Sequence, residues 1–373
     1  MRIGMDALPL SGEKSGVGYY TEQLLRALER VEGKNEYVLF STRDFDSPFS
    51  DSSRFRKRIA PLLLGYAWMQ VGQPVQIAKE RLDLYHGPNF VVPLAAPCPT
   101  VITIHDLSSF ILRKTHKWTN NLIQRVLVPP SARRSRLIIA VSDATRSDVV
   151  RILGIHEEKI RVIPEAVDGI FSPVADNESR RRVMRRLGLP EKFILFVGTL
   201  EPRKNIPTLL EAFAYLIRRG DIKHQLVLAG VQGWGGRSIQ KKVRFLGIEE
   251  RVKFTGYVAR EDLPMLYSMA DSFVYPSLYE GFGLPPLEAM ACGTPVIVSD
   301  GSALSSVVAE AGIRVDPNDV HGLAQAMRNV LMDKRLRSDL IKRGMERVKC
   351  FSWDATARET LALYEEAAFS RGD

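Results

Sequence analysis

The sequence predicts an α/β protein with two doubly wound parallel-sheet domains that face each other across a cleft. Its 373 residues exceed what one hydrophobic core usually supports, so two domains are expected. Short apolar, β-branched runs alternate with amphipathic helical stretches along the whole chain, which indicates parallel sheets with helices on both faces. Several runs are apolar at consecutive positions, as in ILFV at 194–197, because a strand buried on both faces has no polar side.

The expected strands fall into two sets of five. Those of the first half are Arg2–Met5, Tyr37–Ser41, Leu82–His86, Thr100–His105 and Leu137–Val141. Those of the second half are Phe193–Gly198, Gln225–Gly230, Arg251–Thr255, Phe273–Pro276 and Pro295–Ser299. Open parallel sheets bind ligands beyond the carboxyl ends of their strands, so the residues that follow each strand are the functional candidates.

Helical periodicity is clearest in the second half. Apolar residues recur at spacings of three and four in Asn205–Arg219, Val320–Met332 and Lys334–Val348, as on the buried face of a helix. A final amphipathic helix is expected from Ser352 to about Phe369.

The domain boundary is expected near residues 165–192, where an extended connector leads into a basic helix. We therefore expect an N-terminal domain at 1–172 and a C-terminal domain at 173–352, followed by a helix at 353–373.

Composition favours a globular protein, with 45% hydrophobic and 25% charged residues. No stretch reaches the roughly 20 apolar residues of a transmembrane helix, and the N-terminus lacks the apolar run of a signal peptide. Cys98, Cys292 and Cys350 form no CxxC pair, which argues against a zinc knuckle and favours the cytoplasm. The net charge of +9 favours anionic partners such as nucleic acid, membranes or phosphorylated substrates.

Residues 54–69 combine a basic run, Arg54–Arg58, with an apolar stretch rich in Leu, Tyr and Trp. Such a segment can lie on a membrane interface. It can also form a helix that packs on its own domain and keeps a basic face in water, and the sequence leaves both interpretations open.

A glycine-rich turn with Gly12, Gly16 and Gly18 follows the first expected strand and precedes a helix expected from about Tyr19. Backbone N–H groups at a helix N-terminus favour an anion, although such glycines can also simply make room for packing. The turn lacks the third glycine of the dinucleotide fingerprint GxGxxG, which argues against a nicotinamide dehydrogenase.

His105 and Asp106 follow the strand that starts at Thr100. The position at a carboxyl end favours a hydrogen bond from His105 to substrate over a structural role. His86, His105 and His116 do not have the spacing of zinc ligands.

Arg203 and Lys204 follow the strand Phe193–Gly198 and precede a helix. Two adjacent cations at such a junction suit a diphosphate, with a solvated basic loop as the alternative. Glu280 and Glu288 flank a turn with two glycines and a proline pair after the strand that ends at Pro276. The N–H groups of this turn can hold a phosphate, Glu280 can contact a sugar, and Glu288 can accept hydrogen bonds from ribose.

These segments resemble the motifs of family 4 retaining glycosyltransferases, which have the GT-B fold of two Rossmann-like domains. EGFGLPPLE at 280–288 is similar to the family's E-x7-E motif, and GTLEPRKN at 198–205 to its donor-phosphate segment. SGVGYY at 15–20 and His105-Asp106 are similar to its N-terminal motifs, and FTGYV at 254–258 lies where the family contacts the base. The resemblance covers nearly the whole chain. It implies that the domain at 1–172 binds the acceptor, that the domain at 173–352 binds the donor, and that the helix at 353–373 crosses back to the N-terminal domain.

The resemblance implies a role for each matching residue. The catalytic set is His105, Glu280, Arg203 and Lys204, which contact the donor sugar and neutralise the departing diphosphate. The remaining donor-binding residues are Gly16, Gly18, Gly198, Val258, Phe282, Gly283, Leu284 and Glu288. The family needs no metal or other cofactor, and the only DxD, at 44–46, lies in a polar stretch without a catalytic pattern.

The resemblance also implies same-face attack on the donor, in which the diphosphate helps to take the acceptor proton and Glu280 is not the nucleophile. MDALPLSGEKSGVGYYTEQLLRAL and TVITIHDLS are similar to bacterial mannosyltransferases of surface polysaccharide and lipopolysaccharide assembly. This favours GDP-mannose as donor and a glycan or lipid-diphosphate-linked acceptor, at the cytoplasmic face of the membrane with possible peripheral attachment. A UDP-hexose donor is the main alternative.

Two rivals from other classes are weaker. A GT-B nucleotide-sugar epimerase shares the two-sheet architecture, but E-x7-E argues against it. A non-catalytic or nucleic-acid-binding protein would lack Arg203, Lys204, Glu280 or Glu288, or would show basic residues interleaved with stacking aromatics, and the sequence has no such pattern.

Overall fold

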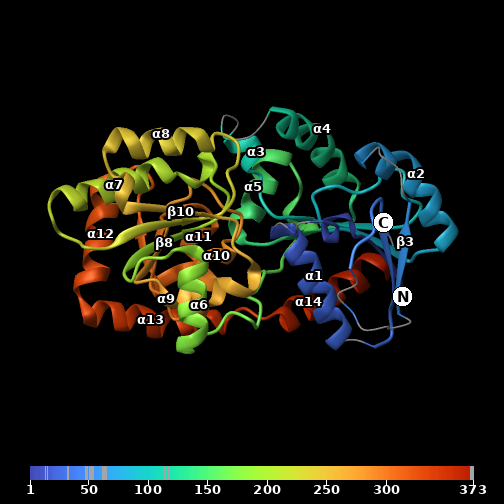
Figure 1. Cartoon of the computed structure of the whole chain (residues 1–373). Coiled ribbons are helices and arrows are strands. Elements are labelled where there is room, and N and C mark those ends of the chain that lie inside the picture. The colour runs from blue at the N-terminus through green and yellow to red at the C-terminus, as the bar shows by residue number, and fades with distance from the viewer. Residues whose placement is uncertain are drawn as a thin grey trace. The chain divides into compact units, whose positions relative to one another are not determined.

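The computed structural model describes residues 1–12, 14, 16–31, 33–46, 49, 54–60, 65–112, 115 and 118–369. The chain divides into two compact α/β units (Figure 1). The first comprises Met1–Ile111, Trp118–Glu165 and the chain from Ser352 onward, and the second consists mainly of Ala166–Phe351.

The first unit ends at Glu165 rather than at residue 172 because the connector that follows packs on the second unit. The carboxylate of Asp168 lies 3.1 Å from the guanidinium of Arg260, Phe171 is buried, and the N–H of Val174 donates to the Ser268 hydroxyl.

The first unit contains a seven-stranded sheet with the order β3-β2-β1-β4-β5-β6-β7. Every neighbouring pair is parallel. Its strands are β1 (Arg2–Asp6), β2 (Glu36–Ser41), β3 (Phe55–Ile59), β4 (Leu84–Gly87), β5 (Thr100–Ile104), β6 (Leu137–Ala140) and β7 (Ile160–Val162).

The second unit contains a six-stranded sheet with the order β10-β9-β8-β11-β12-β13, again parallel throughout. Its strands are β8 (Phe193–Val197), β9 (Gln225–Ala229), β10 (Val252–Gly256), β11 (Ser272–Tyr275), β12 (Val296–Ser299) and β13 (Ile313–Val315). The expected fold class is confirmed, and all ten expected strands are present within two residues of their predicted ends.

Three strands were not expected, namely β3, β7 and β13, and each lies at the edge of its sheet. An edge strand is only half covered, so it lacks the continuous apolar run that marks the central strands. Their partly exposed residues bear this out, since none of the five β3 positions is fully buried.

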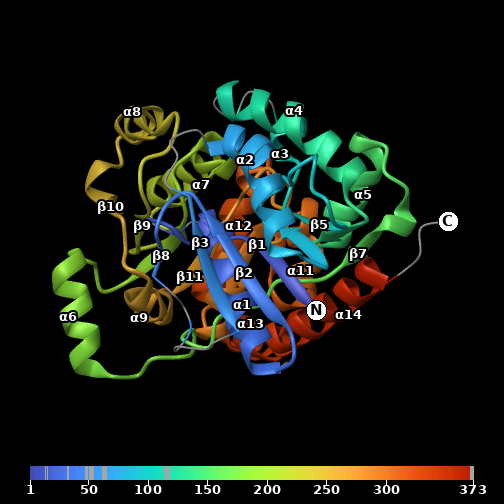
Figure 2. The same ribbon diagram turned by 90° about the vertical axis from the view of Figure 1, so that its right-hand side faces the viewer.

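The helices of the first unit cover both faces of its sheet. They are α1 (Gly16–Val31), α2 (Gly65–Glu80), α3 (Ser108–Ile111), α4 (Trp118–Arg134), α5 (Asp143–Leu153) and α14 (Trp353–Phe369). Crossovers between parallel strands are right-handed, so α2, α4 and α5 share one face because their crossovers run in the same direction along the sheet. The crossover through α1 runs the opposite way, and α14 packs against α1 on the other face (Figure 2).

The helices of the second unit likewise alternate with its strands. They are α6 (Asn177–Leu187), α7 (Ile206–Arg218), α8 (Gly236–Leu246), α9 (Leu263–Met269), α10 (Leu284–Ala291), α11 (Ser302–Val308), α12 (Val320–Met332) and α13 (Lys334–Val348). The periodicities that predicted α7, α12 and α13 are therefore confirmed.

The basic run Arg54–Arg58 forms most of strand β3, so the helical interpretation does not hold for the basic run. Its charges are partly used inside the domain: Arg58 pairs with Glu80, and the Lys57 ammonium lies 3.2 Å from the Asp44 carboxylate. Residues 61–64 lie outside the described part of the chain, and α2 begins at Gly65.

Candidate active site

The second unit has a topological switch point between β8 and β11. The chain leaves β8 toward β9 and β10 and later returns on the other side through β11 to β13. The loops after β8 and β11 therefore diverge at the carboxyl edge of the sheet, where doubly wound proteins bind their ligands. Arg203 and Lys204 follow β8, and Glu280 follows β11.

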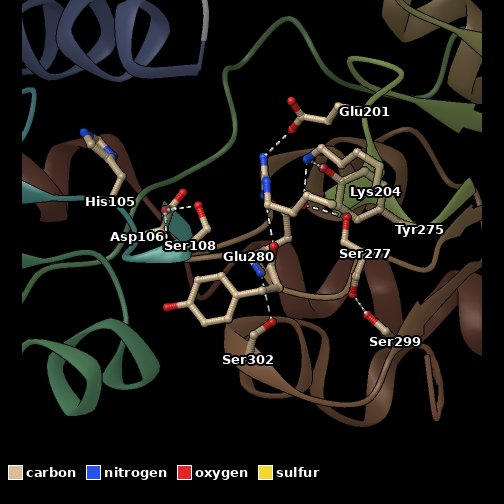
Figure 3. A network of polar contacts seen from close by, with 12 residues as sticks. His105, Asp106, Ser108, Glu201, Lys204, Tyr275, Ser277, Glu280, Ser299 and Ser302 are labelled. Atoms are coloured by element: carbon tan, nitrogen blue, oxygen red, sulfur yellow. Dashed lines mark hydrogen bonds and ion pairs between the residues drawn. The ribbon is translucent and has the colours of Figure 1, made fainter. Parts of the chain in front are cut away.

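Figure 3 shows Lys204 beside Glu280, and Arg203 pairs with the same carboxylate. Arg203 Nη1 lies 2.7 Å from Glu280 Oε2, and Lys204 Nζ lies 2.6 Å from Glu280 Oε1. Arg203 also lies 3.0 Å from the Glu201 carboxylate, and Lys204 donates to the hydroxyl of Tyr275. We call these five residues the ion cluster.

Burial and charge act in opposite directions on Glu280. Burial alone would raise its pKa, but Arg203 and Lys204 outweigh burial, and the Ser277 hydroxyl donates a further hydrogen bond of 2.6 Å, so the pKa falls to about 2. Burial, followed by the charge of Arg203, lowers the pKa of Lys204. A carboxylate so strongly stabilised is a poor base and a poor nucleophile, which leaves Glu280 a binding and positioning role.

Backbone contacts hold the loops around the ion cluster together. The N–H of Leu278 donates to the carbonyl of Arg203 over 2.9 Å, and the N–H of Glu280 donates to the Ser302 hydroxyl over 3.1 Å. The Ser299 hydroxyl donates to the Ser277 carbonyl. The charges are therefore fixed in place, as preorganised electrostatic stabilisation requires.

Glu288 belongs to a second charged group on α10. The Tyr267 hydroxyl donates to Glu288 Oε2 over 2.9 Å, and the Arg260 guanidinium lies 3.8 Å from Glu288 Oε1 while it also pairs with Asp168. Burial raises the pKa of Glu288, and Arg260 opposes that rise. A buried carboxylate whose charge is incompletely compensated is stabilised by hydrogen-bond donors such as ribose hydroxyls.

The predicted turn between the two glutamates begins helix α10. Phe282 is buried, and Leu284 is the first residue of the helix, so the N–H groups here point outward from its N-terminus. Gly283 has φ +118°, and a Cβ there would lie 2.6 Å from Leu304 Cδ2, so a side chain would be both strained and obstructed. Gly198 directly follows β8, whereas Val258 follows β10 and lies two strands away from β8.

Of the three glycines of the predicted turn, Gly16 and Gly18 lie in α1, and Gly12 precedes the helix. The helix begins at Gly16, three residues earlier than expected, and Ser15 lies outside the described residues. A Cβ on Gly18 would lie 2.5 Å from the carbonyl oxygen of Pro9, so Gly18 permits close packing. Gly16 is exposed at the helix N-terminus, where an anion is favoured.

His105 is held by both ring nitrogens. Nδ1 lies 2.8 Å from Glu165 Oε1, and Nε2 lies 2.8 Å from the carbonyl oxygen of Pro88. The two contacts together fix the orientation of the ring. Direct contact between the ring and a sugar would require Nε2 to exchange the Pro88 carbonyl for a sugar hydroxyl.

A buried neutral cluster links His86 to three other residues. His86 Nε2 lies 2.8 Å from Thr103 Oγ1, and His86 Nδ1 lies 2.7 Å from the Tyr364 hydroxyl on α14. The Tyr20 hydroxyl lies 3.2 Å from the same Thr103 oxygen, and the Tyr20 ring meets that of His105 edge-on at 4.7 Å. Burial, helped by the nearby His105, lowers the pKa of His86 to about 3, so His86 is neutral near pH 7.

Comparison with known proteins gives the family. Residues 14–169 match the Glycosyltransferase Family 4 domain, and residues 179–347 match the domain of glycosyl transferases group 1. The Escherichia coli O-antigen chain mannosyltransferase B is 32% identical over 98% of this chain and 100% of its own length. The chain is a family 4 glycosyltransferase. This membership argues against the epimerase and dehydrogenase readings.

Solved structures agree with the GT-B fold. Sucrose-phosphate synthase from Thermosynechococcus elongatus is 26% identical to this glycosyltransferase, covers 98% of both chains and superposes with a TM-score of 0.79. HepE from Anabaena, solved with UDP-glucose, is 22% identical, covers 97% of this chain and 100% of its own, and has a TM-score of 0.78.

Sequence reasoning missed several residues of these groups: Glu165, Asp168, Glu201, Arg260, Tyr267 and Tyr275. Glu201 and Arg260 follow β8 and β10 closely, so the rule that located Arg203 could have found them. Glu165 follows β7, which was not predicted. Among the described residues no group of three or more His, Cys, Asp or Glu side chains could hold a metal ion.

Proposed function

We propose that this glycosyltransferase transfers mannose from GDP-mannose to a glycan or lipid-diphosphate-linked glycan in surface polysaccharide synthesis. The full-length likeness to the Escherichia coli O-antigen chain mannosyltransferase B carries the proposal. A relative that matches from end to end shares both domains, and hence the regions that bind donor and acceptor.

The ion cluster supports a metal-independent reaction. As the bond between the anomeric carbon and the diphosphate oxygen breaks, negative charge grows on the leaving GDP, where Arg203 and Lys204 would stabilise it. The acceptor oxygen bonds to the anomeric carbon on the face that the diphosphate leaves, and its proton passes to the departing phosphate oxygen. Configuration is retained without a covalent intermediate on Glu280, whose low pKa suits this role.

The remaining assignments follow the same logic. As in the family, the N–H groups of Phe282, Gly283 and Leu284 would donate hydrogen bonds to phosphate. Glu288 would bind the ribose. The backbone near Gly198 and Val258 would contact the nucleotide. No helix in the described part of the chain has the length and apolar content to cross a bilayer. We place the reaction at the cytoplasmic face of the membrane.

Ligand-dependent thermal unfolding in EDTA tests the donor. A nucleotide sugar at 100 times its dissociation constant stabilises the protein by about 2.7 kcal/mol, so GDP-mannose should raise Tm clearly while UDP-glucose and ADP-glucose do not. NMR of the first product should then show the anomeric configuration of the donor. Loss of the GDP-mannose response in EDTA, or an inverted product, would contradict the proposal.

A UDP-hexose is the second candidate donor, favoured by the likeness of the fold to HepE in complex with UDP-glucose. A Tm shift with UDP-glucose alone would select it and leave the roles of the ion cluster unchanged.

A further inference from the structure

One face of the first unit exposes apolar side chains on two helices. Val71 and Val75 of α2 are 77% and 56% exposed, and Leu122 and Val126 of α4 are 53% and 58% exposed. Residues four apart lie on the same side of a helix. Each helix therefore turns a stripe of aliphatic side chains outward, where surface helices normally carry charge.

The two helices form one surface because both bind the same loop. Gln70 of α2 donates to the Val92 carbonyl and accepts from the N–H of Leu94, over 3.0 and 2.9 Å. From α4, the Ser131 hydroxyl accepts from the Val92 N–H, and Arg134 donates to the Leu94 carbonyl. We call the exposed aliphatic set the apolar face: Val71, Val75, Leu94, Leu122, Ile123 and Val126.

The exposed charge on the two helices of the apolar face is positive. The sequences of α2 and α4 contain a single carboxylate, Glu80, which is buried and pairs with Arg2 and Arg58. Helix α4 contains Arg125, Arg133 and Arg134 and no Asp or Glu. Arg133 and Arg134 at the end of α4 are exposed, so a basic margin adjoins the aliphatic side chains.

We propose that the apolar face docks on an anionic lipid bilayer. Aliphatic side chains enter the boundary between headgroups and acyl chains, while arginines beside them meet lipid phosphates. A second copy of this chain is disfavoured because two surfaces of the same charge repel each other. The surface differs from the segment 54–69 that the sequence suggested, whose basic run is committed to strand β3.

Vesicle flotation of the full chain tests this surface. Wild-type protein should float with vesicles of phosphatidylglycerol and phosphatidylcholine, bind pure phosphatidylcholine far less, and detach as salt rises. Val71→Glu combined with Val126→Glu, one change on each helix, should lower the partition coefficient at least about tenfold. Phe245→Glu on α8 is the matched control, since Phe245 is 81% exposed in the second unit.

The milder double variant Val71→Ser, Val126→Ser should lose part of the vesicle binding. It provides a second test in case the glutamate variant does not fold. The Tm response to nucleotide sugar should be equal in all variants, which separates this result from the fate of the proposed function. If both double variants float with anionic vesicles as well as wild-type protein does, the proposal is wrong. Lipid-independent self-association in sedimentation velocity that the glutamate variant abolishes would also overturn it, because the face would then join two copies.

Discussion

The two sheets follow the same strand order around their switch points, yet they place different chemistry there. Strands β1, β4 and β5 correspond in order to β8, β11 and β12. In the second unit the loops beyond these strands carry the ion cluster. In the first unit His86 on β4 and Thr103 on β5 belong to the buried neutral cluster, and the paired His105 follows β5.

The difference shows how one topology serves two tasks. Fixed opposite charges are suited to a ligand whose own charge changes during reaction, because they need not reorganise when that change occurs. Neutral hydrogen-bonded side chains are instead suited to holding a shape, since a satisfied buried network is rigid. Changes in the ion cluster should therefore reduce activity, and changes in the neutral cluster should reduce stability.

The largest effect is expected for Lys204→Ala. The variant removes one of two cations from Glu280, and turnover should fall at least about a hundredfold, the scale of losing one preorganised electrostatic contact. Glu280→Ala should have a similar effect. Steady-state kinetics with saturating donor measure both, with Lys242→Ala, which removes a surface pair with Glu211, as the control. Near-normal turnover in both variants would remove the ion cluster from the mechanism.

His86→Phe should act on stability. The variant leaves the buried hydroxyls of Thr103 and Tyr364 without their imidazole partner. The free energy of unfolding should therefore fall by about 1–3 kcal/mol near pH 7. Thermal unfolding should detect this, while the exposed His156→Phe should leave Tm unchanged.

The cost of His86→Phe should also depend on pH. The folded pKa of His86, about 3, is below its ordinary 6.5, so between these values the unfolded chain binds a proton that the folded protein refuses. Wild-type stability from this group is therefore lost as pH falls below 6.5. The Tm gap between wild type and variant should narrow from pH 7 to pH 4, and a constant gap would show that folding does not lower the pKa of His86.

Glu165→Gln separates charge from geometry at His105. Glutamine can still form a hydrogen bond with Nδ1, but it removes the carboxylate charge beside the ring. We expect kcat to fall about tenfold with little change in KM and with an altered pH profile, the scale of a modest electrostatic contribution. Equal kcat and pH profiles would make the Glu165 contact merely structural.

Glu288→Gln should have the smallest effect, with opposite signs for stability and donor affinity. Because burial raises the folded pKa of Glu288, its ionised form costs stability, and the loss grows as pH rises through that pKa. The variant should have a slightly higher Tm at neutral pH than wild type, with a smaller gain in acid. Donor affinity should fall a few-fold to about tenfold, the scale of one hydrogen bond to a charged group, and the exposed Glu250→Gln should change neither quantity.

The sequence was sufficient for the central strands because their residues are apolar on both faces. It failed at β3, where Arg56, Lys57 and Arg58 are consecutive and only the first and last residues of the strand are apolar. Charge at an edge strand protects it from pairing with another chain, but in a sequence the same charge resembles a solvated helix or a membrane segment.

The site was predictable where the chemistry follows a strand directly. Arg203, Lys204 and Glu280 lie close behind β8 and β11, and the order of the strands brings them together. The pairing of His105 with Glu165 was not predictable, because 60 residues separate them and the strand before Glu165 has only three residues. The exposure of the apolar face depends on which side of α2 and α4 packs inward, and periodicity alone does not decide that.

The return of α14 to the first unit has a consequence for the order in which the protein is made. Tyr364 completes the hydrogen bonds of His86, and Thr356 donates to the carbonyl of Pro164 over 2.7 Å, so residues from the end of the chain finish the core of its beginning. During synthesis the second unit has its whole sequence available before the first one does, although the first emerges earlier. A fragment cut after Glu165 would lack the helix that covers α1, and the first unit could be isolated only by joining α14 back to it.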